Sequence, residues 1–398
     1  MSEIAERLEE LRERGLYRRL RLVEGPQGPR VLLGEREVLL LCSNNYLGLA
    51  DDPRVREAAA EAALRWGAGA GASRLISGNM EPHRKLERQL AAFKGHEAAL
   101  LFGSGYLANT GVIAALAGQG QVVFSDELNH ASIVDGCRLS RAETFVYRHA
   151  DLEHLAWGLR EAGERAALIV SDGVFSMDGD VAPLAGLAEL AGRHRCRLMV
   201  DEAHATGAVG PGGRGSVAAA GLGDEVDVVV GTLGKALGSY GAYVCADAET
   251  VDLLVNCARP FIFSTAPPPP AIGAAARSLA LLEAEPERVE RLQANAAILR
   301  DGLAAEGLAA GSSRTQIVPV EVGEAEPTID LCERLLDGGV FAQGIRPPTV
   351  PPGSSRLRFT VMATHSAADL ERAARKAGIA ARAFDLASAA PQPARAAA

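Results

Sequence analysis

The sequence predicts an α/β fold in which a large domain holds a mostly parallel sheet and a smaller α+β domain accompanies it. From about residue 50, helical stretches alternate with short runs that are almost entirely apolar, as in strands buried on both faces. This alternation is typical of a parallel sheet covered by helices. Polar residues end several of the runs, so they are expected at the carboxyl edge of the sheet, where such folds bind ligands.

The apolar runs and helical stretches of the large domain follow one another regularly. We expect strands at residues 98–102, 122–124, 144–147, 167–171, 197–200, 226–230 and 242–245, with helices that include 53–66, 82–93 and 105–116.

A run of four prolines at residues 267–270 separates this pattern from a second one, because proline cannot continue a helix or a central strand. Beyond it we expect helices at 271–308, 329–336 and 367–383, and strands at 316–322 and 357–361. The N-terminal segment, with a helix at 1–20 and strands at 31–33 and 38–42, is expected to pack with this smaller domain. The predicted boundaries are therefore 1–48 for the N-terminal segment, 49–270 for the large domain, 271–387 for the small domain and 388–398 for a disordered tail.

Composition excludes several classes of protein. The 398 residues carry a net charge of -9, which argues against a nucleic-acid surface, and no apolar run is long enough to cross a membrane. The charged N-terminus fits neither a signal peptide nor a transit peptide, so a cytoplasmic location is expected. The six cysteines contain no C-x-x-C pair and the eight histidines no H-E-x-x-H motif, so neither a disulfide framework nor a metal site is predicted.

Asp201 follows an apolar run and can be interpreted in two ways. It can cap the next helix, a common role for aspartate at such a position. It can also be a partly desolvated carboxylate that keeps a bound pyridinium nitrogen protonated, which makes a cofactor ring an electron sink.

Lys235 ends the segment G-T-L-G-K, which follows another apolar run. A single lysine is usually a solvated surface charge. However, glycines at 234 and 238 would let a ligand approach the backbone closely, and a desolvated lysine at a strand end can attack a carbonyl. Thr232, three residues earlier, offers a hydroxyl suited to a phosphate.

Residues 103–108, G-S-G-Y-L-A, fit the glycine-rich fingerprint of dinucleotide-binding proteins, and Asp126 lies 23 residues after Gly103. A phosphate is favourable at such a helix N-terminus whichever cofactor carries it, so a nicotinamide-dependent oxidoreductase is an alternative. The combination of this helix with Asp201 and with Lys235, 34 residues later, favours pyridoxal phosphate, because a nicotinamide enzyme has no evident need for the lysine.

Six motifs in order along the chain resemble those of the α-oxoamine synthases, a family of fold-type I pyridoxal-phosphate enzymes. They are S-N-N-Y-L-G-L at 43–49, G-S-G-Y-L-A-N at 103–109, N-H-A-S at 129–132, G-V-F-S-M-D-G-D at 173–180, D-E-A-H-A-T-G at 201–207 and T-L-G-K at 232–235. The resemblance spans about residues 15–380 and implies a fold-type I transferase.

The resemblance implies four catalytic residues. Lys235 would hold pyridoxal 5'-phosphate as a Schiff base and later transfer protons, while Asp201 would bind the pyridine nitrogen. His204 would bind the phenolic oxygen, and His130 would stack on the ring face opposite the lysine.

Further roles follow from the same resemblance. Gly105 and Tyr106 would contact the cofactor through their backbone, and Ser176 and Thr232 would contact its ring or phosphate region. Ser264 and Thr265 would reach the phosphate bound by a neighbouring subunit, which implies an obligate homodimer with its sites at the interface.

The implied substrate-binding residues are Arg18, Asn44, His130, Arg346, Thr349 and Arg358, of which Arg358 would fork onto an amino acid carboxylate. The loop at 344–353, G-I-R-P-P-T-V-P-P-G, resembles the members that condense L-alanine with a pimeloyl thioester. The donor would be pimeloyl-CoA or a pimeloyl-carrier protein, and the products 8-amino-7-oxononanoate, CO₂ and free thiol, a step of biotin biosynthesis.

Other functions stay open at this stage. The nearest alternative is a member of the same family that uses glycine or serine, of the 2-amino-3-ketobutyrate CoA ligase or serine palmitoyltransferase type. A member that binds the cofactor without catalysis is a further alternative. The sequence assigns no role to Asn45, Tyr240 or Tyr243.

Overall fold

The computed structural model describes residues 2–384, so the tail predicted at 388–398 lies outside the described residues. The described chain forms two compact units. The large unit comprises residues 49–176 and 180–289, and the small unit comprises residues 2–48, 177–179 and 290–384. The domain boundaries given above stay predictions.

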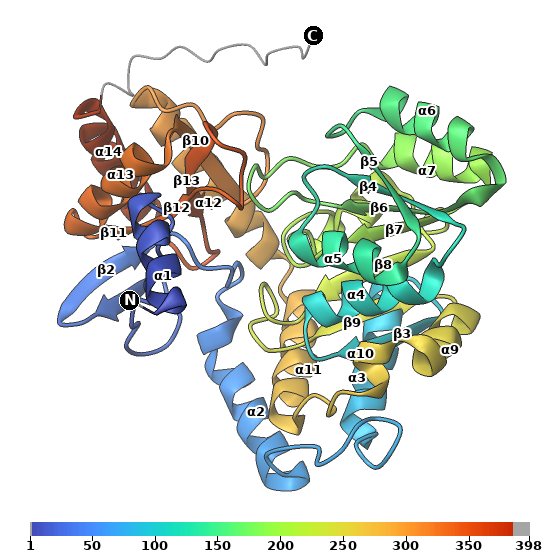
Figure 1. Ribbon diagram of the computed structural model, residues 1–398. Coiled ribbons are helices and arrows are strands. Elements are labelled where there is room, and N and C mark those ends of the chain that lie inside the picture. The colour runs from blue at the N-terminus through green and yellow to red at the C-terminus, as the bar shows by residue number, and fades with distance from the viewer. Residues whose placement is uncertain (1, 385–398) are drawn as a thin grey trace. The chain divides into compact units, whose positions relative to one another are not determined.

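The large unit is built on a seven-stranded sheet with the order β3-β9-β8-β7-β6-β4-β5 (Figure 1). Its strands are β3 (Ala98–Phe102), β4 (Val122–Asp126), β5 (Glu143–Tyr147), β6 (Ala166–Asp172), β7 (Arg197–Asp201), β8 (Val228–Thr232) and β9 (Ala242–Ala246). The strands from β8 to β5 are parallel, whereas β9 is antiparallel to both β8 and β3. The prediction of a mostly parallel sheet is confirmed.

Helices cover both faces of this sheet, as buried strands require. They are α2 (Pro53–Trp66), α3 (Glu81–Lys94), α4 (Gly105–Leu116), α5 (Ala131–Ser140), α6 (Leu152–Ala162), α7 (Leu184–His194), α8 (Ser216–Ala220), α9 (Ala248–Cys257), α10 (Arg259–Ile262) and α11 (Pro269–Ala284), with short 3₁₀ turns at Leu49–Asp51, Gly163–Arg165 and Pro211–Gly213. One core joins alternate strand residues such as Val230 and Val244 to α4, α5, α9 and α10. Cys245, which points to the other face, bonds to the Leu90 carbonyl of α3.

The small unit contains two three-stranded sheets, β1-β2-β11 and β10-β13-β12. Its elements are α1 (Glu3–Glu13), β1 (Arg30–Leu33), β2 (Arg36–Leu40), β10 (Ile317–Gly323), α13 (Ala325–Asp337), β11 (Val340–Phe341), β12 (Gln343–Ile345), β13 (Ser355–Thr360) and α14 (Ala367–Arg382). The boundary between the units falls within α12 (Glu287–Ala305), after Val289. The N-terminal strand β2 pairs with β1 on one side and with β11 on the other, which explains why the N-terminal segment groups with the C-terminal residues.

Two predicted elements differ from the structure for local reasons. The helix predicted at 271–308 is wrong as a single element, because α11 ends at Ala284 and α12 begins at Glu287, on either side of Pro286. The proline run also opens a helix, since Pro269 and Pro270 occupy the first turn of α11, where a missing N–H costs nothing. The short strands β11 and β12 were not predicted.

We predict opposite effects on stability for two glycine substitutions in the large unit. Gly238 has φ +56°, and a Cβ there would lie 2.3 Å from the backbone nitrogen of Ala50, so Gly238→Ala should lower the free energy of unfolding by about 1–3 kcal/mol or more. Gly192, on α7, has nothing within 4 Å of such a Cβ, so Gly192→Ala should raise it by about 0.5–1 kcal/mol. Denaturant unfolding measures both free energies, and equal effects of the two substitutions would contradict the steric difference between these glycines.

Candidate active site

Three buried aspartates end three neighbouring parallel strands of the large unit. They are Asp126 on β4, Asp172 on β6 and Asp201 on β7. Asp172 and Asp201 are partners in the ladder, so two carboxyl groups lie side by side at the carboxyl edge of the sheet. Sequence reasoning singled out Asp201 and Asp126 but missed Asp172.

Asp201 is held in one orientation by two donors. Its Oδ1 accepts the backbone N–H of Ala203 at 2.8 Å, and its Oδ2 accepts Nδ2 of Asn109 at 2.6 Å. The same Asn109 nitrogen donates to Ser132 Oγ at 2.8 Å, and Ser132 Oγ lies 2.7 Å from Nδ1 of His130. A chain of side-chain contacts therefore links the predicted ring-binding carboxylate to the predicted stacking histidine. Asn109 was not predicted.

The structure brings two of the predicted catalytic residues, Lys235 and His204, into contact. Nζ of Lys235 lies 2.9 Å from Nε2 of the buried His204, and Lys235 sits in the short connection between β8 and the antiparallel β9. His204 follows β7 by three residues, so both side chains come from the same edge of the sheet as Asp201. An amine, an imidazole and a carboxylate at one sheet edge are a suitable donor set for the polar groups of a pyridoxal ring.

Asp172 and His130 have perturbed acidities at this edge. Burial raises the pKa of Asp172 well above its ordinary value, and the nearby charge of Asp201 raises it further. The Asp172 carboxylate accepts the backbone N–H of His130 at 2.8 Å. Desolvation of the His130 ring lowers its pKa, an effect to which Lys235 adds. A neutral imidazole at position 130 is suited to stacking on an aromatic ring.

The first turn of α4 lies beside the strand ends and leaves room for a ligand. Ser104 caps the helix by accepting the N–H of Leu107 at 3.2 Å, and nothing lies within 4 Å of the place where a Cβ on Gly105 would stand. The Tyr106 hydroxyl donates to Asp135 at 2.5 Å, so its side chain is bound to α5 while its N–H belongs to the open first turn. Such a turn is a ready site for a phosphate.

The remaining predicted cofactor residues lie at the end of β8 or in loops of the large unit. Thr232 ends β8, where its hydroxyl donates to the Gly241 carbonyl at 3.2 Å and accepts the N–H of Gly234 at 3.1 Å. Ser176 lies four residues beyond the end of β6. Ser264 and Thr265 follow α10, and Thr265 bridges to Ser73. The roles of Thr232, Ser176, Ser264 and Thr265 in binding the cofactor stay predictions.

The glutamate of the D-E-A-H segment, Glu202, forms a buried ion pair with Lys94. Nζ of Lys94 lies 2.5 Å from Oε2 of the fully buried Glu202, whose other oxygen accepts Ser216 Oγ at 2.8 Å. Lys94 also donates to Thr206 Oγ1 at 2.9 Å, and Thr206 Oγ1 lies 2.9 Å from the Tyr243 hydroxyl. The network gives Tyr243 a role that the sequence left open, namely completing the polar contacts beneath the segment that carries Asp201 and His204.

His149 joins two aspartates in a third polar cluster. Its Nδ1 lies 3.0 Å from Oδ1 of Asp126 and its Nε2 lies 2.9 Å from Oδ2 of Asp180. Although burial opposes protonation, the two carboxylates raise the pKa of His149 to about 10. Asp126 also accepts the backbone N–H groups of Leu128 and Ala150. Because this carboxylate is already engaged within the protein, the residue required to bind a ribose in the dinucleotide interpretation is not available.

In the small unit, Arg358 is buried in the middle strand of a sheet. It lies on β13, opposite Pro319 of β10 and Gln343 of β12. Burial raises the pKa of the Tyr46 hydroxyl, and the charge of Arg358 partly offsets this. Tyr46 also donates to Oδ1 of Asn44 at 3.1 Å, so two predicted substrate residues flank one buried tyrosine. Asn45, whose role the sequence left open, donates to the Gln27 carbonyl at 2.8 Å.

Three other predicted substrate residues line one cavity of the small unit, with a volume of about 850 Å³. They are Arg18, Arg346 and Thr349. Arg346 donates to the Tyr17 carbonyl at 2.8 Å, and its burial together with the charge of Arg18 lowers its pKa. Apolar side chains such as Ile329 and Phe341 share the cavity, which therefore suits a chain with an acidic end.

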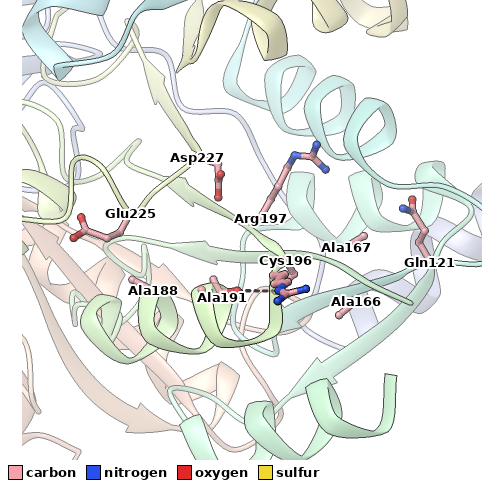
Figure 2. A pocket seen from close by; sticks show the side chains of 11 residues that line it. Gln121, Ala166, Ala167, Ala188, Ala191, Cys196, Arg197, Glu225 and Asp227 are labelled. Carbon is pink, nitrogen blue, oxygen red and sulfur yellow. Dashed lines mark hydrogen bonds between the residues drawn. The ribbon is translucent and has the colours of Figure 1, made fainter. Parts of the chain in front are cut away.

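A second cavity, of about 600 Å³, lies at the amino ends of β6 and β7 in the large unit, at the sheet edge opposite the aspartates (Figure 2). Its walls are formed by residues such as Ala166, Cys196 and Arg197, and it contains none of the predicted site residues. Among residues 2–384, no group of three histidine, cysteine or acidic side chains is arranged to hold a metal ion.

The comparisons with known proteins decide the family. The model for class I and II aminotransferases matches residues 36–376. The chain belongs to this family. It is 56% identical over 373 residues to 8-amino-7-oxononanoate synthase of Geobacter sulfurreducens, covering 93% of this chain and 95% of that relative.

Solved structures with a similar fold agree with this result. A serine palmitoyltransferase variant from S. paucimobilis with a bound PLP–myriocin aldimine matches with a TM-score of 0.92 and 34% identity, covering 97% of this chain and 98% of that one. An 8-amino-7-oxononanoate synthase from Francisella tularensis matches with a TM-score of 0.76 and 26% identity, covering 87% and 99%. The predicted fold class and the resemblance to α-oxoamine synthases are confirmed.

We predict that Lys94→Met destabilises the protein by about 3–5 kcal/mol, because Glu202 would be left as an uncompensated buried charge. Adding Glu202→Gln should recover part of the loss, since the remaining amide needs no counter-ion. The matched control is Arg193→Met, which breaks the exposed Arg193–Glu189 pair and should cost less than about 1 kcal/mol. Denaturant unfolding measures all three, and a loss as small for Lys94→Met as for the control would contradict this account.

Proposed function

We propose that the protein is a pyridoxal-phosphate-dependent acyltransferase that condenses L-alanine with a pimeloyl thioester. The products are 8-amino-7-oxononanoate, CO₂ and free thiol, a step of biotin biosynthesis. The observation that carries the proposal is the placement of Lys235 Nζ 2.9 Å from His204, at the sheet edge where Asp201 is buried. The 56% identity to a relative named 8-amino-7-oxononanoate synthase supports the same reaction.

The residues at the sheet edge fit the polar groups of pyridoxal phosphate. Asp201, fixed by Asn109 and Ala203, is suited to accept a ring N–H, and His204 to bind the phenolic oxygen. The open first turn at Gly105 and the hydroxyl of Thr232 are suited to the phosphate and ring region. When bound, the cofactor supplies an electron sink for negative charge at the amino acid α-carbon.

Lys235 is the residue we assign to proton transfer. With cofactor and amino acid bound, the Lys235 amine would remove the α-proton and later return a proton after CO₂ has left. His204, 2.9 Å away, positions the amine and shares its protons. The loss of CO₂ requires the new carbon–carbon bond to be formed first, so the acyl thioester must bind while the α-carbon is deprotonated.

Two sets of residues in the small unit are assigned to the substrates. Arg358, buried on β13, is suited to grip the alanine carboxylate through its planar guanidinium. The cavity at Arg18, Arg346 and Thr349 combines positive charge with apolar walls, as a pimeloyl chain with a terminal carboxylate requires. Whether the thiol belongs to coenzyme A or to a carrier protein makes no difference to these contacts.

Members that use glycine or serine are the second candidate, because structures named serine palmitoyltransferase match at TM-scores of 0.90–0.92. The identity to those structures is 33–34%, against 50–56% for the relatives named 8-amino-7-oxononanoate synthase. The balance favours alanine.

A homodimer is part of the proposal. Leu75, Ile76 and Phe263 are large apolar side chains with 49, 81 and 71% of their surface exposed. The Ser73–Thr265 bridge and the bond from Ala266 N to the Ala72 carbonyl bring their two segments together beside Ser264. A second copy covering this surface would place Ser264 and Thr265 near the partner's phosphate.

No helix among residues 2–384 is long and apolar enough to cross a membrane. A cytoplasmic location is part of the proposal.

The purified protein should be yellow, and borohydride reduction should fix the cofactor to Lys235, as peptide mass spectrometry would detect. Lys235→Ala should lower the rate of thiol release by at least about a hundredfold, because general acid–base groups contribute about 10²–10⁴ to the rate.

The rate of thiol release from pimeloyl-CoA should be highest when alanine, and not glycine or serine, is the amino acid substrate. A preference for glycine or serine, or a Lys235→Ala enzyme of normal rate, would overturn the proposal.

Ile76→Asp should convert a dimer into a monomer in light scattering, because a charge on the exposed apolar surface would oppose its burial. Ile379→Asp, at a side chain 64% exposed on α14, is the matched control and should leave the dimer intact. A wild-type monomer would refute the dimer while leaving the assignment of Lys235 untouched.

A further inference from the structure

His149 lies outside the residues assigned to the cofactor, yet it is among the most constrained side chains of the large unit. Both ring nitrogens are engaged by carboxylates, Asp126 at 3.0 Å and Asp180 at 2.9 Å. A histidine bonded to an acceptor on each nitrogen must carry a proton on both, so the imidazole is a fixed cation. Its pKa of about 10 agrees with this state.

The two carboxylates belong to different parts of the chain. Asp126 ends β4 and is anchored by the N–H groups of Leu128 and Ala150, both at 2.9 Å. Asp180 follows the turn after β6 and has no neighbouring N–H partner comparable to those of Asp126; its Oδ1 is buried without a hydrogen-bond partner among the described residues. His149 therefore joins Asp180, which has one oxygen without a hydrogen-bond partner in the described part of the chain, to an aspartate that two backbone N–H groups already hold.

The backbone beside His149 is strained in order to make this tie. Ala150 has φ +55°, a left-handed conformation that is unfavourable for alanine. This conformation lets the Ala150 N–H and the His149 ring reach the same Asp126 carboxylate, while Glu127 accepts the His149 backbone N–H at 2.8 Å. Strain of this kind persists only where surrounding contacts fix it.

His149 contacts both sides of the turn that carries Ser176. One arm is contacted through Asp180, and the other through Phe175, whose ring meets the His149 ring edge-on at 4.5 Å between centroids. The arms are joined to each other by the bond from Phe175 N to the Asp180 carbonyl at 3.0 Å and by the Val174–Val181 bridge. Ser176 is the residue directly after Phe175.

We propose that His149 is a positioning residue that, clamped between Asp126 and Asp180, fixes the turn beyond β6 so that Ser176 keeps the orientation needed to contact the cofactor. The proposal rests on the function proposed above, because it takes Ser176 as a contact of pyridoxal phosphate. His149 itself touches neither cofactor nor substrate in this account.

The test measures the dissociation constant of pyridoxal phosphate by fluorescence or absorbance titration of four full-length proteins. These are the wild type, His149→Ala, Ser176→Ala and the double variant. His149→Ala should weaken binding by about tenfold, as expected when one hydrogen bond to a charged ligand is lost. In the Ser176→Ala background the same change should have little further effect, because the two substitutions remove one contact. Equal, additive effects in both backgrounds would overturn the proposal.

A milder variant and a control guard against misfolding. Asp180→Asn keeps the shape of the clamp but removes one charge, so it should weaken binding in the same direction even if His149→Ala does not fold. His154→Ala changes a neighbouring histidine that accepts the Arg148 N–H and stacks on Trp157, and it should leave binding unchanged. If Asp180→Asn and His149→Ala, each as a single variant, both bind pyridoxal phosphate as tightly as the wild type, the positioning role is also refuted.

The failure of this proposal and the failure of the proposed function give different results. If the wild type binds no pyridoxal phosphate, the proposed function fails. The clamp can still be judged by NMR titration of the His149 ring, which should titrate near pH 10 in the wild type and lower in Asp180→Asn. If the wild-type His149 ring titrates near the ordinary pKa of histidine, the ring is not held as a cation between the two carboxylates, and the positioning proposal fails.

Discussion

The large unit depends on how three buried carboxyl groups are accommodated at one edge of a parallel sheet. Strands β4, β6 and β7 each end in an aspartate, and parallel order places the three ends at the same edge. Burying three negative charges side by side would cost much free energy, so each carboxyl group is stabilised in a different way. Asp126 gains a fixed histidine cation, Asp172 is driven towards its protonated form, and Asp201 is oriented by an amide and a backbone N–H.

This division of roles is consistent with the proposed binding of a cationic ring at Asp201. Asp201 accepts two neutral donors, Asn109 Nδ2 and the Ala203 N–H, whereas Asp126 is paired with His149. In the proposed function, a protonated pyridine nitrogen would bring a positive charge to Asp201. The neighbouring Lys94–Glu202 pair is self-contained, so it stiffens the segment from Asp201 to Thr206 without competing for that ring.

The parts of the structure that sequence could predict are those encoded locally. Apolar runs of three to five residues indicated every strand of the large sheet. Asp201, His204 and Lys235 each follow such a run, so parallel order brings them to the same edge of the sheet. The short strands β11 and β12 carry too few residues to show a pattern. Asn109, Lys94 and His149 could not be found in this way, because their roles depend on partners 92, 108 and 31 residues away. The signal that could have found Asp172 was its position, one more acidic residue at the end of an apolar run.

The antiparallel placement of β9 constrains the position of the Lys235 side chain. A parallel neighbour of β8 would have required a long crossover, whereas β9 returns directly and pairs Thr232 with Ala242. Lys235 therefore sits on a short hairpin whose two ends belong to one ladder. A shift of one residue in the pairing of β8 with β9 would move one strand by roughly 3.3 Å along the other and turn its side chains to the opposite face of the sheet. The Lys235 Nζ would then be displaced by a similar distance. Insertions or deletions between these two strands should thus be far less tolerable than in the surface loops elsewhere in the chain.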